Sequence, residues 1–512
     1  MNKFLDTIIL VYLVVVLGLV RSSINIPGPR SYNDKIAIIG AGPSGVHMAY
    51  LLKQKGFRNI HILEKTSRIG GKSQTLYYRG APQELGTVYI SPDYEENIVK
   101  LVNKYIPGDL VNLPSASIWL GNEEPITYQQ YIIQFGREFL RTDDKIIILK
   151  TFVRTLRRYI TLHRNLFGEY EGELFPEPSQ QTMKLIGGTF KEFLERNNML
   201  ILTPIFEAST TVQGYGNIHS TAALYGLLWN TPKFMNGFLE RLKGSQNSTG
   251  NYMLKSGFQI LWETMAKKER LHVKFNVDIV RVYRNYKNGC QSVWLCMREG
   301  GSPFAWKNYD FLIWSPEMKR SLRYWMNYVP KEKKLFNAAR PTYFTASIVN
   351  SKNEIRGQTP IDYWIDNMHE DYPHSVWAQR DSYSSIRQYG GPKYQNGKLP
   401  SGNDNRSART CVVYQMGSFE PTLFSVQNKL LSHLKKINGT NIEILKTKIW
   451  RYFPRYSPRD MTKGYLWRIL ELQGKYSMWY IGSSVCFESV KSVIEYNELL
   501  VRNMQQPSER TL

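Results

Sequence analysis

The chain has 512 residues, 42% of them hydrophobic and 21% charged, which is enough ordinary globular material for two or three domain-sized units. Lysine and arginine number 66 against 43 aspartate and glutamate residues, so the formal net charge is +23. The basic residues form only short clusters and no nucleic-acid-binding motif, so no nucleic-acid partner is expected. The four cysteines have neither metal-ligand spacing nor the density of a disulfide framework, and no metal site is predicted.

Residues 1–22 are expected to be a signal peptide or an N-terminal anchor. The apolar run Thr7–Val20 is shorter than the roughly twenty residues that a spanning helix needs. This length favours a cleaved signal, and so a secreted or lumenal protein, over an uncleaved membrane anchor. Contact with a membrane is expected only through this segment, if it is retained. Three glycosylation sequons are compatible with the secretory route, at Asn247, Asn405 and Asn438.

The next segment, residues 35–64, has the order strand, glycine turn, helix, strand and acid. Ile36–Ile39 is a short β-branched run and predicts a buried strand, and a second strand over 59–63 ends on Glu64. Between them the turn reads G-x-G-x-x-G and opens a helix that runs to about residue 55. This arrangement is typical of a dinucleotide-binding unit.

Each polar or glycine position of this unit has a physical role. Gly40 permits the tight turn, and Gly42 lets the backbone approach a pyrophosphate. Gly45 lets the helix pack closely on the strand, so that its positive N-terminus faces the phosphates. Glu64 stands where a carboxylate can accept hydrogen bonds from ribose hydroxyls. Taken alone, the unit could serve NAD or FAD.

The sequence that follows, Arg68-Ile-Gly-Gly-Lys72, resembles the second signature of the flavin amine oxidase superfamily. That resemblance implies FAD, with the backbone of the paired glycines against its pyrophosphate and basic side chains beside the phosphates and the flavin. The cofactor contacts expected from this first part of the chain are Gly40, Gly42, Pro43, Ser44, Gly45, Glu64, Lys65, Arg68, Gly70, Gly71 and Lys72.

The strand–helix alternation stops after residue 90, and residues 91–254 are expected to form a helical cap and substrate region. Apolar positions at helical spacing predict a long amphipathic helix over residues 143–167. Thr189 and Glu192 form the pattern of a capping box that opens another helix. A further helix is expected over residues 221–229.

The cofactor domain resumes twice. Residues 255–316 resemble the family's return segment, in which the backbone at Ile279 would meet the adenine. Residues 317–439 are expected to form a strand-rich substrate-binding region that includes an exposed loop at 398–410. Residues 440–505 complete the cofactor domain with a strand that ends in glycine and a helix over 488–501. Their expected contacts with FAD are Gly482, Ser483, Ser489 and Val490.

The predicted fold is therefore α/β. A discontinuous, doubly wound Rossmann-type domain made of 34–90, 255–316 and 440–505 binds FAD, with the helical cap and the strand-rich region inserted. Within the superfamily the pattern is closest to the polyenoic fatty acid isomerase-like branch, on segments such as 214–216 and 256–259. The position of the family's flavin-linking cysteine is Lys448, so FAD is expected to be non-covalent. No basic residue occupies the segment that matches the isomerases' carboxylate clamp, and no catalytic side chain is assigned.

Three functions follow from the sequence. The first is an FAD-dependent oxidoreductase whose flavin takes a hydride from a small apolar or amine-bearing substrate. The second is an isomerase that returns the hydride to another carbon of a polyunsaturated lipid, without net redox change. The third is a non-catalytic, FAD-binding lumenal scaffold. Only the first two predict a small molecule that bleaches the flavin.

Overall fold

The computed structural model describes residues 25–507 except 114, 122–123, 169–173, 175–176, 243–250, 286–291, 358, 370–371 and 382–408. The predictions for the N-terminal 22 residues, for the sequons at Asn247 and Asn405, and for most of the 398–410 loop lie outside these residues. Within the described part of the chain, no helix combines the length and the apolar character that crossing a membrane requires.

A parallel five-stranded sheet forms the centre of one half of the molecule. Its strand order is β19-β13-β1-β2-β9, and every neighbouring pair is parallel. The three passes of the chain each contribute to it: β1 (Ile36–Ile39) and β2 (Ile60–Leu63), then β9 (Val273–Lys274) and β13 (Phe311–Trp314), and finally β19 (Met478–Tyr480). All four residues of β1 are buried, as expected for a strand covered on both faces. The predicted doubly wound α/β fold is confirmed.

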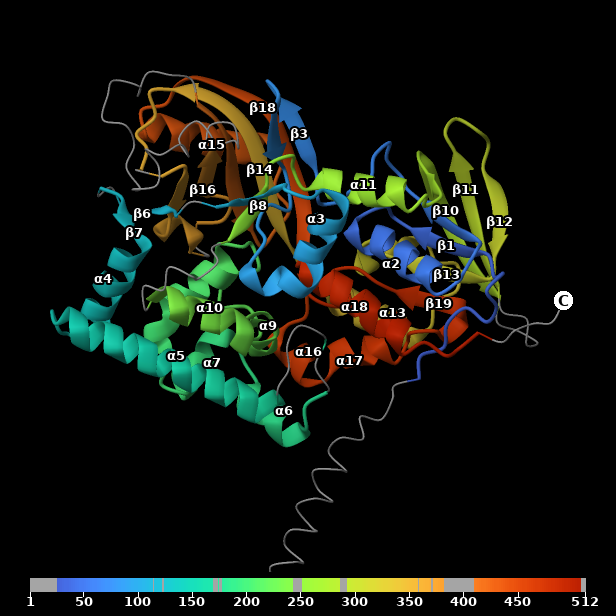
Figure 1. Ribbon diagram of the computed structural model, residues 1–512, viewed down its shortest axis with the longest axis horizontal. Helices are drawn as coiled ribbons and strands as arrows, with labels where there is room; N and C mark the ends of the chain where they lie inside the picture. The colour runs from blue at the N-terminus through green and yellow to red at the C-terminus, as the bar shows by residue number, and fades with distance from the viewer. Residues whose placement is uncertain are drawn as a thin grey trace, which may run out of the picture.

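Helices α2 (Pro43–Gln54) and α18 (Val490–Arg502) pack together beside this sheet (Figure 1). The side-chain amide of Asn497 donates to the carbonyl oxygen of Ser44 at 2.7 Å, which joins segments 453 residues apart. The helix expected from residue 488 begins at Val490, because Ser489 caps it by accepting a hydrogen bond from the Ser492 amide. An antiparallel sheet of β10 (Val277–Asn285), β11 (Ser292–Glu299) and β12 (Ala305–Tyr309) lies at the right of Figure 1.

The second large sheet has seven strands in the order β18-β14-β17-β16-β15-β6-β7. Its longest strands are β18 (Thr440–Arg455) and β14 (Arg340–Lys352), and β17 (Arg409–Gly417), β16 (Val376–Asp381) and β15 (Ile361–Trp364) follow. The sheet takes strands from outside the expected 317–439 region. β6 (Ser117–Trp119) and β7 (Ile126–Thr127) come from the range assigned to the cap, and β18 from the range assigned to the cofactor domain. β6 and β7 are too short, and β18 is too far in sequence from its partner β14, for the local sequence to show which sheet each strand joins.

A group of helices between residues 128 and 242 lies below this sheet, at the lower left of Figure 1. The long amphipathic helix is α5 (Lys145–Phe167), with Asp144 as its N-cap. The predicted capping box is present at α7 (Phe190–Arg196), where Thr189 and Glu192 bond each other's backbone amides. The other cap helices are α4 (Tyr128–Leu140), α6 (Gln180–Ile186), α8 (Thr203–Phe206), α9 (Ala223–Trp229) and α10 (Pro232–Leu242).

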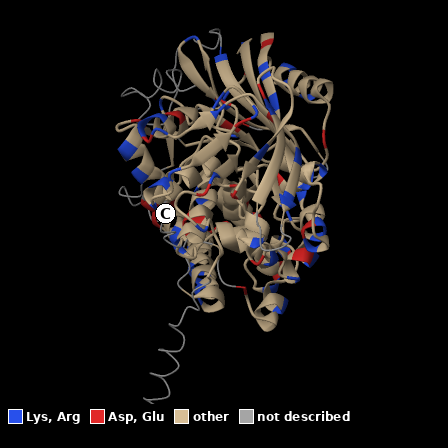
Figure 2. Ribbon diagram, turned by 90° about the vertical axis from the view of Figure 1, so that its right-hand side faces the viewer, with Lys and Arg blue, Asp and Glu red and all other residues tan. Residues whose placement is uncertain are grey.

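The remaining strands and α-helices of the described chain connect these parts. They are β3 (Thr75–Tyr78), β4 (Ala81–Glu84), α3 (Lys100–Tyr105), β5 (Leu110–Asn112), β8 (Tyr252–Leu254), α11 (Gln259–Lys268), α12 (Met318–Ser321), α13 (Pro330–Ala338), α15 (Leu423–Lys436), α16 (Pro458–Thr462) and α17 (Tyr465–Leu470). Lysine and arginine are dispersed over helices and strands in the view of Figure 2, interspersed with acidic residues.

Candidate functional site

A cavity of about 410 Å³ has walls from all three passes of the cofactor domain, from the cap and from the seven-stranded sheet. Most of the predicted cofactor residues line it, namely Gly40, Gly42, Pro43, Ser44, Glu64, Arg68, Gly71, Lys72, Gly482, Ser483, Ser489 and Val490. Gly45, Lys65, Gly70 and Ile279 lie outside its lining. The cavity thus brings together residues from positions 40 to 490.

The glycines of the turn differ in what requires them. Gly40 has a φ of +97°, which favours glycine, and a Cβ on Gly45 would lie 2.0 Å from the carbonyl oxygen of Gly40. Gly42 meets neither constraint: its φ is −76°, and a Cβ there would stand 3.6 Å from its nearest neighbour, the Cα of Gly71. The protein itself leaves room for a Cβ at Gly42. A ligand that approaches the backbone closely explains the glycine.

Gly71 forms the opposite side of this cradle. Its φ is +53°, and a Cβ would lie 2.9 Å from the Cα of Gly42. Arg68, which also lines the cavity, donates to the carbonyl oxygen of Gly71 at 2.7 Å and so fixes the loop. The neighbouring Gly70 is held by its amide, which donates to the Ala41 carbonyl at 2.8 Å. Two backbone segments therefore face each other, as they would across a pyrophosphate.

The Glu64 carboxylate is held in place by its own loop. Oε2 accepts from the Ala41 amide at 2.7 Å, and Oε1 accepts from the Thr66 amide at 2.8 Å. Ionised carboxylate oxygens have further lone pairs, so Glu64 can also accept from a ligand hydroxyl in the cavity. The Val277 amide donates to the Glu64 carbonyl oxygen, so β10 begins next to Glu64. Two of the predicted cofactor contacts that do not line the cavity are Ile279, which is on β10, and Lys65, which is 71% exposed and forms an ion pair with Asp278.

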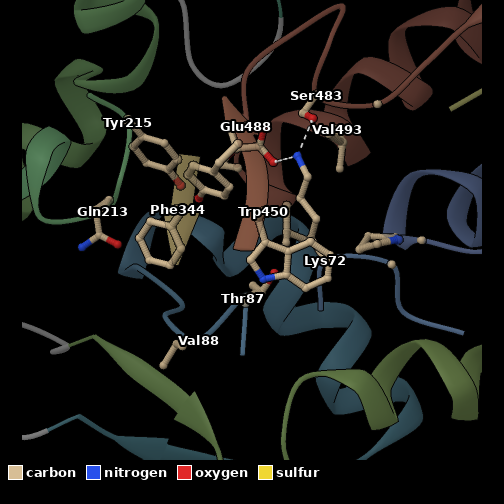
Figure 3. Close-up of a pocket in the computed structure, with 18 of the residues that line it drawn as sticks. Lys72, Thr87, Val88, Gln213, Tyr215, Phe344, Trp450, Ser483, Glu488 and Val493 are labelled. Carbon is tan, nitrogen blue, oxygen red and sulfur yellow. Dashed lines mark hydrogen bonds and ion pairs between the residues drawn. The ribbon is translucent and has the colours of Figure 1, made fainter. Parts of the chain in front are cut away.

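Lys72 crosses the cavity toward the last pass of the chain (Figure 3). Its Nζ lies 2.6 Å from Oε1 of Glu488 and 3.3 Å from the hydroxyl of Ser483. The side chain of Glu488 is 3% exposed, and its other oxygen accepts from the Phe453 amide at 2.7 Å. Glu488 is followed by the N-terminus of α18, which carries a partial positive charge toward the cavity at Ser489 and Val490.

Beyond these polar residues the cavity continues into a chamber lined by aromatic rings. Tyr215 stacks on Tyr452 at a centroid distance of 6.1 Å, and Phe344 contacts Tyr452 at 5.1 Å. Further rings of the lining are Tyr89, Tyr94, Trp229, Tyr363, Trp377, Tyr414 and Trp450. The sequence did not predict this chamber, because the rings come from distant segments and converge only in three dimensions.

Lys448 also reaches this chamber. Its Nζ lies 4.6 Å from the centroid of the Trp450 ring, and burial lowers the pKa of the Lys448 ammonium, with the Arg68 charge acting in the same direction. Lys448 stands at the position that matches the family's flavin-linking cysteine. Its side chain ends in an amine, so it lacks the thiol that such a covalent link uses. Non-covalent binding of a flavin stays a prediction.

Residues 38–105 match the family model described as an NAD(P)-binding Rossmann-like domain. Over 93% of its length the chain is 21% identical to the polyenoic fatty acid isomerase of Ptilota filicina, of which the match covers 95%. Over 39% of its length it is 27% identical to prenylcysteine oxidase 1 of Bos taurus, of which 43% is covered.

Two solved structures share the fold over 92% of this chain. The fatty acid isomerase from P. acnes has a TM-score of 0.71 at 19% identity, with 99% of its chain covered. A putrescine oxidase bound to putrescine has a TM-score of 0.61 at 15% identity, with 98% covered. The chain therefore contains an NAD(P)-binding Rossmann-like domain, is a homologue of a polyenoic fatty acid isomerase, and shares its fold with structures of the flavin amine oxidase family.

Proposed function

We propose that the protein is an FAD-dependent oxidoreductase that removes a hydride from a C–H bond of a small, largely apolar substrate. One observation carries the proposal: a single cavity joins the Gly42–Gly71 cradle, the Glu64 carboxylate and the N-terminus of α18 to an aromatic chamber. The first three are the groups that hold a dinucleotide, and the chamber is a mostly apolar space for the molecule that reacts with it. The residues present fit FAD.

When bound, FAD would supply the two-electron acceptor. The backbone at Gly42 and Gly71 would border the pyrophosphate, and Glu64 would accept from ribose hydroxyls. The N-terminus of α18 would place partial positive charge against the cofactor and stabilise negative charge there, and Lys72 would border the cofactor beside its ion-pair partner Glu488. The rings around Phe344 exclude water from the substrate.

A second candidate is an isomerase that returns the hydride to a different carbon of the same molecule. It is favoured by the likeness to a polyenoic fatty acid isomerase, which extends over 93% of the chain. The two candidates differ in electron balance. Turnover that consumes oxygen or an artificial electron acceptor in proportion to product identifies the oxidoreductase, whereas product formation without either identifies the isomerase.

The cofactor is tested first. Purified protein should be yellow and should release FAD on acid denaturation. Gly42→Val should lose most of the flavin while keeping the fold, because the nearest protein atom leaves room for a side chain there. Gly237→Val is the matched control, since Gly237 lies in α10 with no other group within 4 Å of its added Cβ. A colourless wild-type protein that takes up no added FAD would overturn the proposal.

The reaction is tested by anaerobic bleaching of the flavin with panels of amines, polyenoic lipids, and prenyl or indolic compounds. Rapid bleaching by at least one class is expected. A flavin that no compound reduces, in a protein that binds FAD stoichiometrically, would instead support the non-catalytic scaffold.

A further inference from the structure

The far end of the aromatic chamber contains a compact group of polar atoms, here named the Arg380 cluster: Tyr89, Tyr363, Trp377, Arg380 and Tyr414. All but Arg380 line the cavity. Arg380 lies directly behind them, and its Nε donates to the Tyr414 hydroxyl oxygen at 3.2 Å. The hydroxyl oxygens of Tyr89 and Tyr363 are 3.4 Å apart. Burial raises the pKa of the Tyr363 phenol to about 12, so it remains protonated at neutral pH.

Two donors of this cluster have no hydrogen-bond partner among the described residues. They are Nη2 of Arg380 and Nε1 of Trp377, in side chains that are 1% and 3% exposed. Buried donors are nearly always satisfied in native proteins, and leaving one unsatisfied costs about 1–3 kcal/mol, more for a charged group. Two such donors beside one cavity indicate that an acceptor from outside the chain belongs there.

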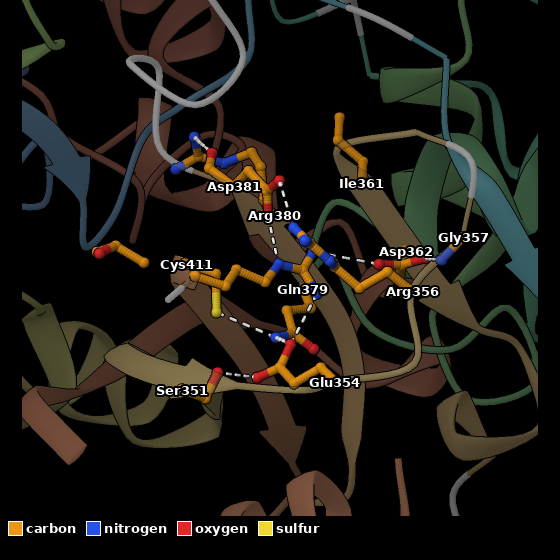
Figure 4. Close-up of polar contacts among 12 residues, drawn as sticks. Ser351, Glu354, Arg356, Gly357, Ile361, Asp362, Gln379, Arg380, Asp381 and Cys411 are labelled. Carbon is orange, nitrogen blue, oxygen red and sulfur yellow. Dashed lines mark hydrogen bonds and ion pairs between the residues drawn. The ribbon is translucent and has the colours of Figure 1, made fainter. Parts of the chain in front are cut away.

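Among the residues that the structure describes, Arg380 also has no carboxylate partner, in contrast to the other buried arginine of this sheet. Arg409 forms ion pairs with Glu354, Asp362 and Asp381, and these three carboxylates are labelled in Figure 4. It lies on the opposite face, because side chains alternate along a strand: Arg380 pairs in register with Val412, which belongs to the apolar cluster of the chamber, while Cys411 and Val413 belong to the cluster beyond the sheet.

Glu84 is the acid whose charge acts on Arg380 through space, but within the described chain the two form no ion pair at 4.0 Å or less. Its oxygens accept instead from the Phe258 amide and, at 3.0 Å, from the Thr75 hydroxyl. Burial raises the pKa of Glu84 to about 7, so part of its population is uncharged at neutral pH. Within the described part of the chain, the buried guanidinium therefore has no ion-pair partner for its positive charge.

We infer that the Arg380 cluster binds a carboxylate at one end of an elongated apolar substrate, an inference that rests on the proposed function. A carboxylate supplies the missing acceptors and the missing negative charge together. The rings of Phe344 and Tyr452 link the cluster to the cofactor site, with centroid distances of 5.6 Å from Tyr414 to Phe344 and 5.1 Å from Phe344 to Tyr452. The apolar part of the acid would lie along these rings and reach Lys72. A cationic amine would be repelled by Arg380.

The test compares ligands that differ only at one end. A long-chain polyenoic acid, its methyl ester and the matching primary amine are titrated into the FAD-loaded protein under anaerobic conditions. Affinity is measured from the perturbation of the flavin absorbance and by calorimetry. We expect the acid to bind at least tenfold more tightly than the ester, and the amine least. Equal affinities for acid and ester would overturn the inference.

Substitutions in the Arg380 cluster test whether the preference for the acid over the ester arises there. Arg380→Met should reduce the acid-to-ester ratio to within about twofold of unity, and Arg380→Lys should restore part of it. Lys446→Met is the matched control, because it removes an exposed cation from β18, in the same sheet but outside the cavity lining. If Arg380→Met fails to fold, Tyr414→Phe and Trp377→Phe each remove one polar atom and should lower the ratio severalfold.

The outcomes separate this inference from the proposed function. A variant that melts earlier but keeps the wild-type ratio shows that Arg380 is structural, which refutes the subsite. Bleaching by amines together with no acid preference also refutes the subsite and leaves the oxidoreductase intact. A strong acid preference in a protein whose flavin is never reduced supports the subsite and refutes the catalytic proposal.

Discussion

Replacing Lys72 by methionine should weaken both the fold and the cofactor site, because Lys72 bridges the first and last passes of the chain. Its ammonium is the ion-pair partner of Glu488, at 2.6 Å, and the Glu488 side chain is only 3% exposed. Removing one partner of a fully buried pair costs about 3–5 kcal/mol. Since the Lys72 side chain is 32% exposed and water can reach it, we expect about 2 kcal/mol for Lys72→Met.

Glu488→Gln should cost less, about 1 kcal/mol, because glutamine keeps an oxygen for the Phe453 amide and leaves Lys72 free to meet water. The double variant should lose about 2 kcal/mol, since the ion pair can be broken only once. The coupling energy is then about 1 kcal/mol. Flavin binding should respond differently: Lys72→Met removes a cation from the cavity and should raise the dissociation constant of FAD more than Glu488→Gln.

The assay is a double-mutant cycle on urea unfolding of the flavin-free proteins, followed by FAD titration of each variant. Circular dichroism of all four proteins checks that the fold is retained. Strictly additive costs, with a coupling energy below about 0.3–0.5 kcal/mol, would show that the contact adds nothing to stability. Unchanged FAD affinity in Lys72→Met would remove Lys72 from the cofactor site.

Three further predictions concern single groups. Because burial raises the pKa of Glu84 from 4.5 to about 7, its contribution to stability should fall as pH rises from 4.5 to 7 and level off above. Glu84→Gln should remove this pH dependence, which amounts to up to about 3 kcal/mol of unfolding free energy between pH 5 and 8. The melting temperature of the variant should therefore change less over this pH range than that of the wild type, and an equal change in both would contradict the prediction. Gly45→Ala should abolish soluble folded protein, because its Cβ would lie 2.0 Å from the Gly40 carbonyl, whereas Gly237→Ala should express normally. Thr189→Ala removes the N-cap of α7 and should cost about 1 kcal/mol by urea unfolding, while an effect on flavin content would be unexpected.

The parts of the fold that were predictable are those set by neighbouring residues. The glycine turn after β1, the capping box at Thr189 and the amphipathic face of α5 each depend on groups within one or two helical turns. The family resemblance indicated which distant segments complete the cofactor domain, but the order of the five strands came only from the structure. The same resemblance placed most of the cofactor residues in one cavity.

The substrate half was not predictable in this way. Tyr89 and Tyr363 are 274 residues apart in the chain, and the Trp450 indole donates to the carbonyl oxygen of Leu85, which lies 365 residues away. Neither partner shows its role in local sequence. Arg380 stands two residues after the apolar run Val376–Ala378, but that it has no carboxylate partner within the described part of the chain is visible only in three dimensions.

The parallel sheet of the cofactor domain also constrains how the protein can be made. Its edge strand β19 is translated roughly 440 residues after β1, which at about 5–20 residues per second takes roughly 20–90 s on the ribosome. β13 is translated about 160 residues before β19, so for roughly 8–32 s its outer edge has no strand beside it, and throughout the longer interval α2 lacks the helix that covers it. An unpaired apolar edge is a template for association with other chains. The nascent chain should therefore depend on chaperones until β19 and α18 have been made, and fragments ending before residue 478 should aggregate.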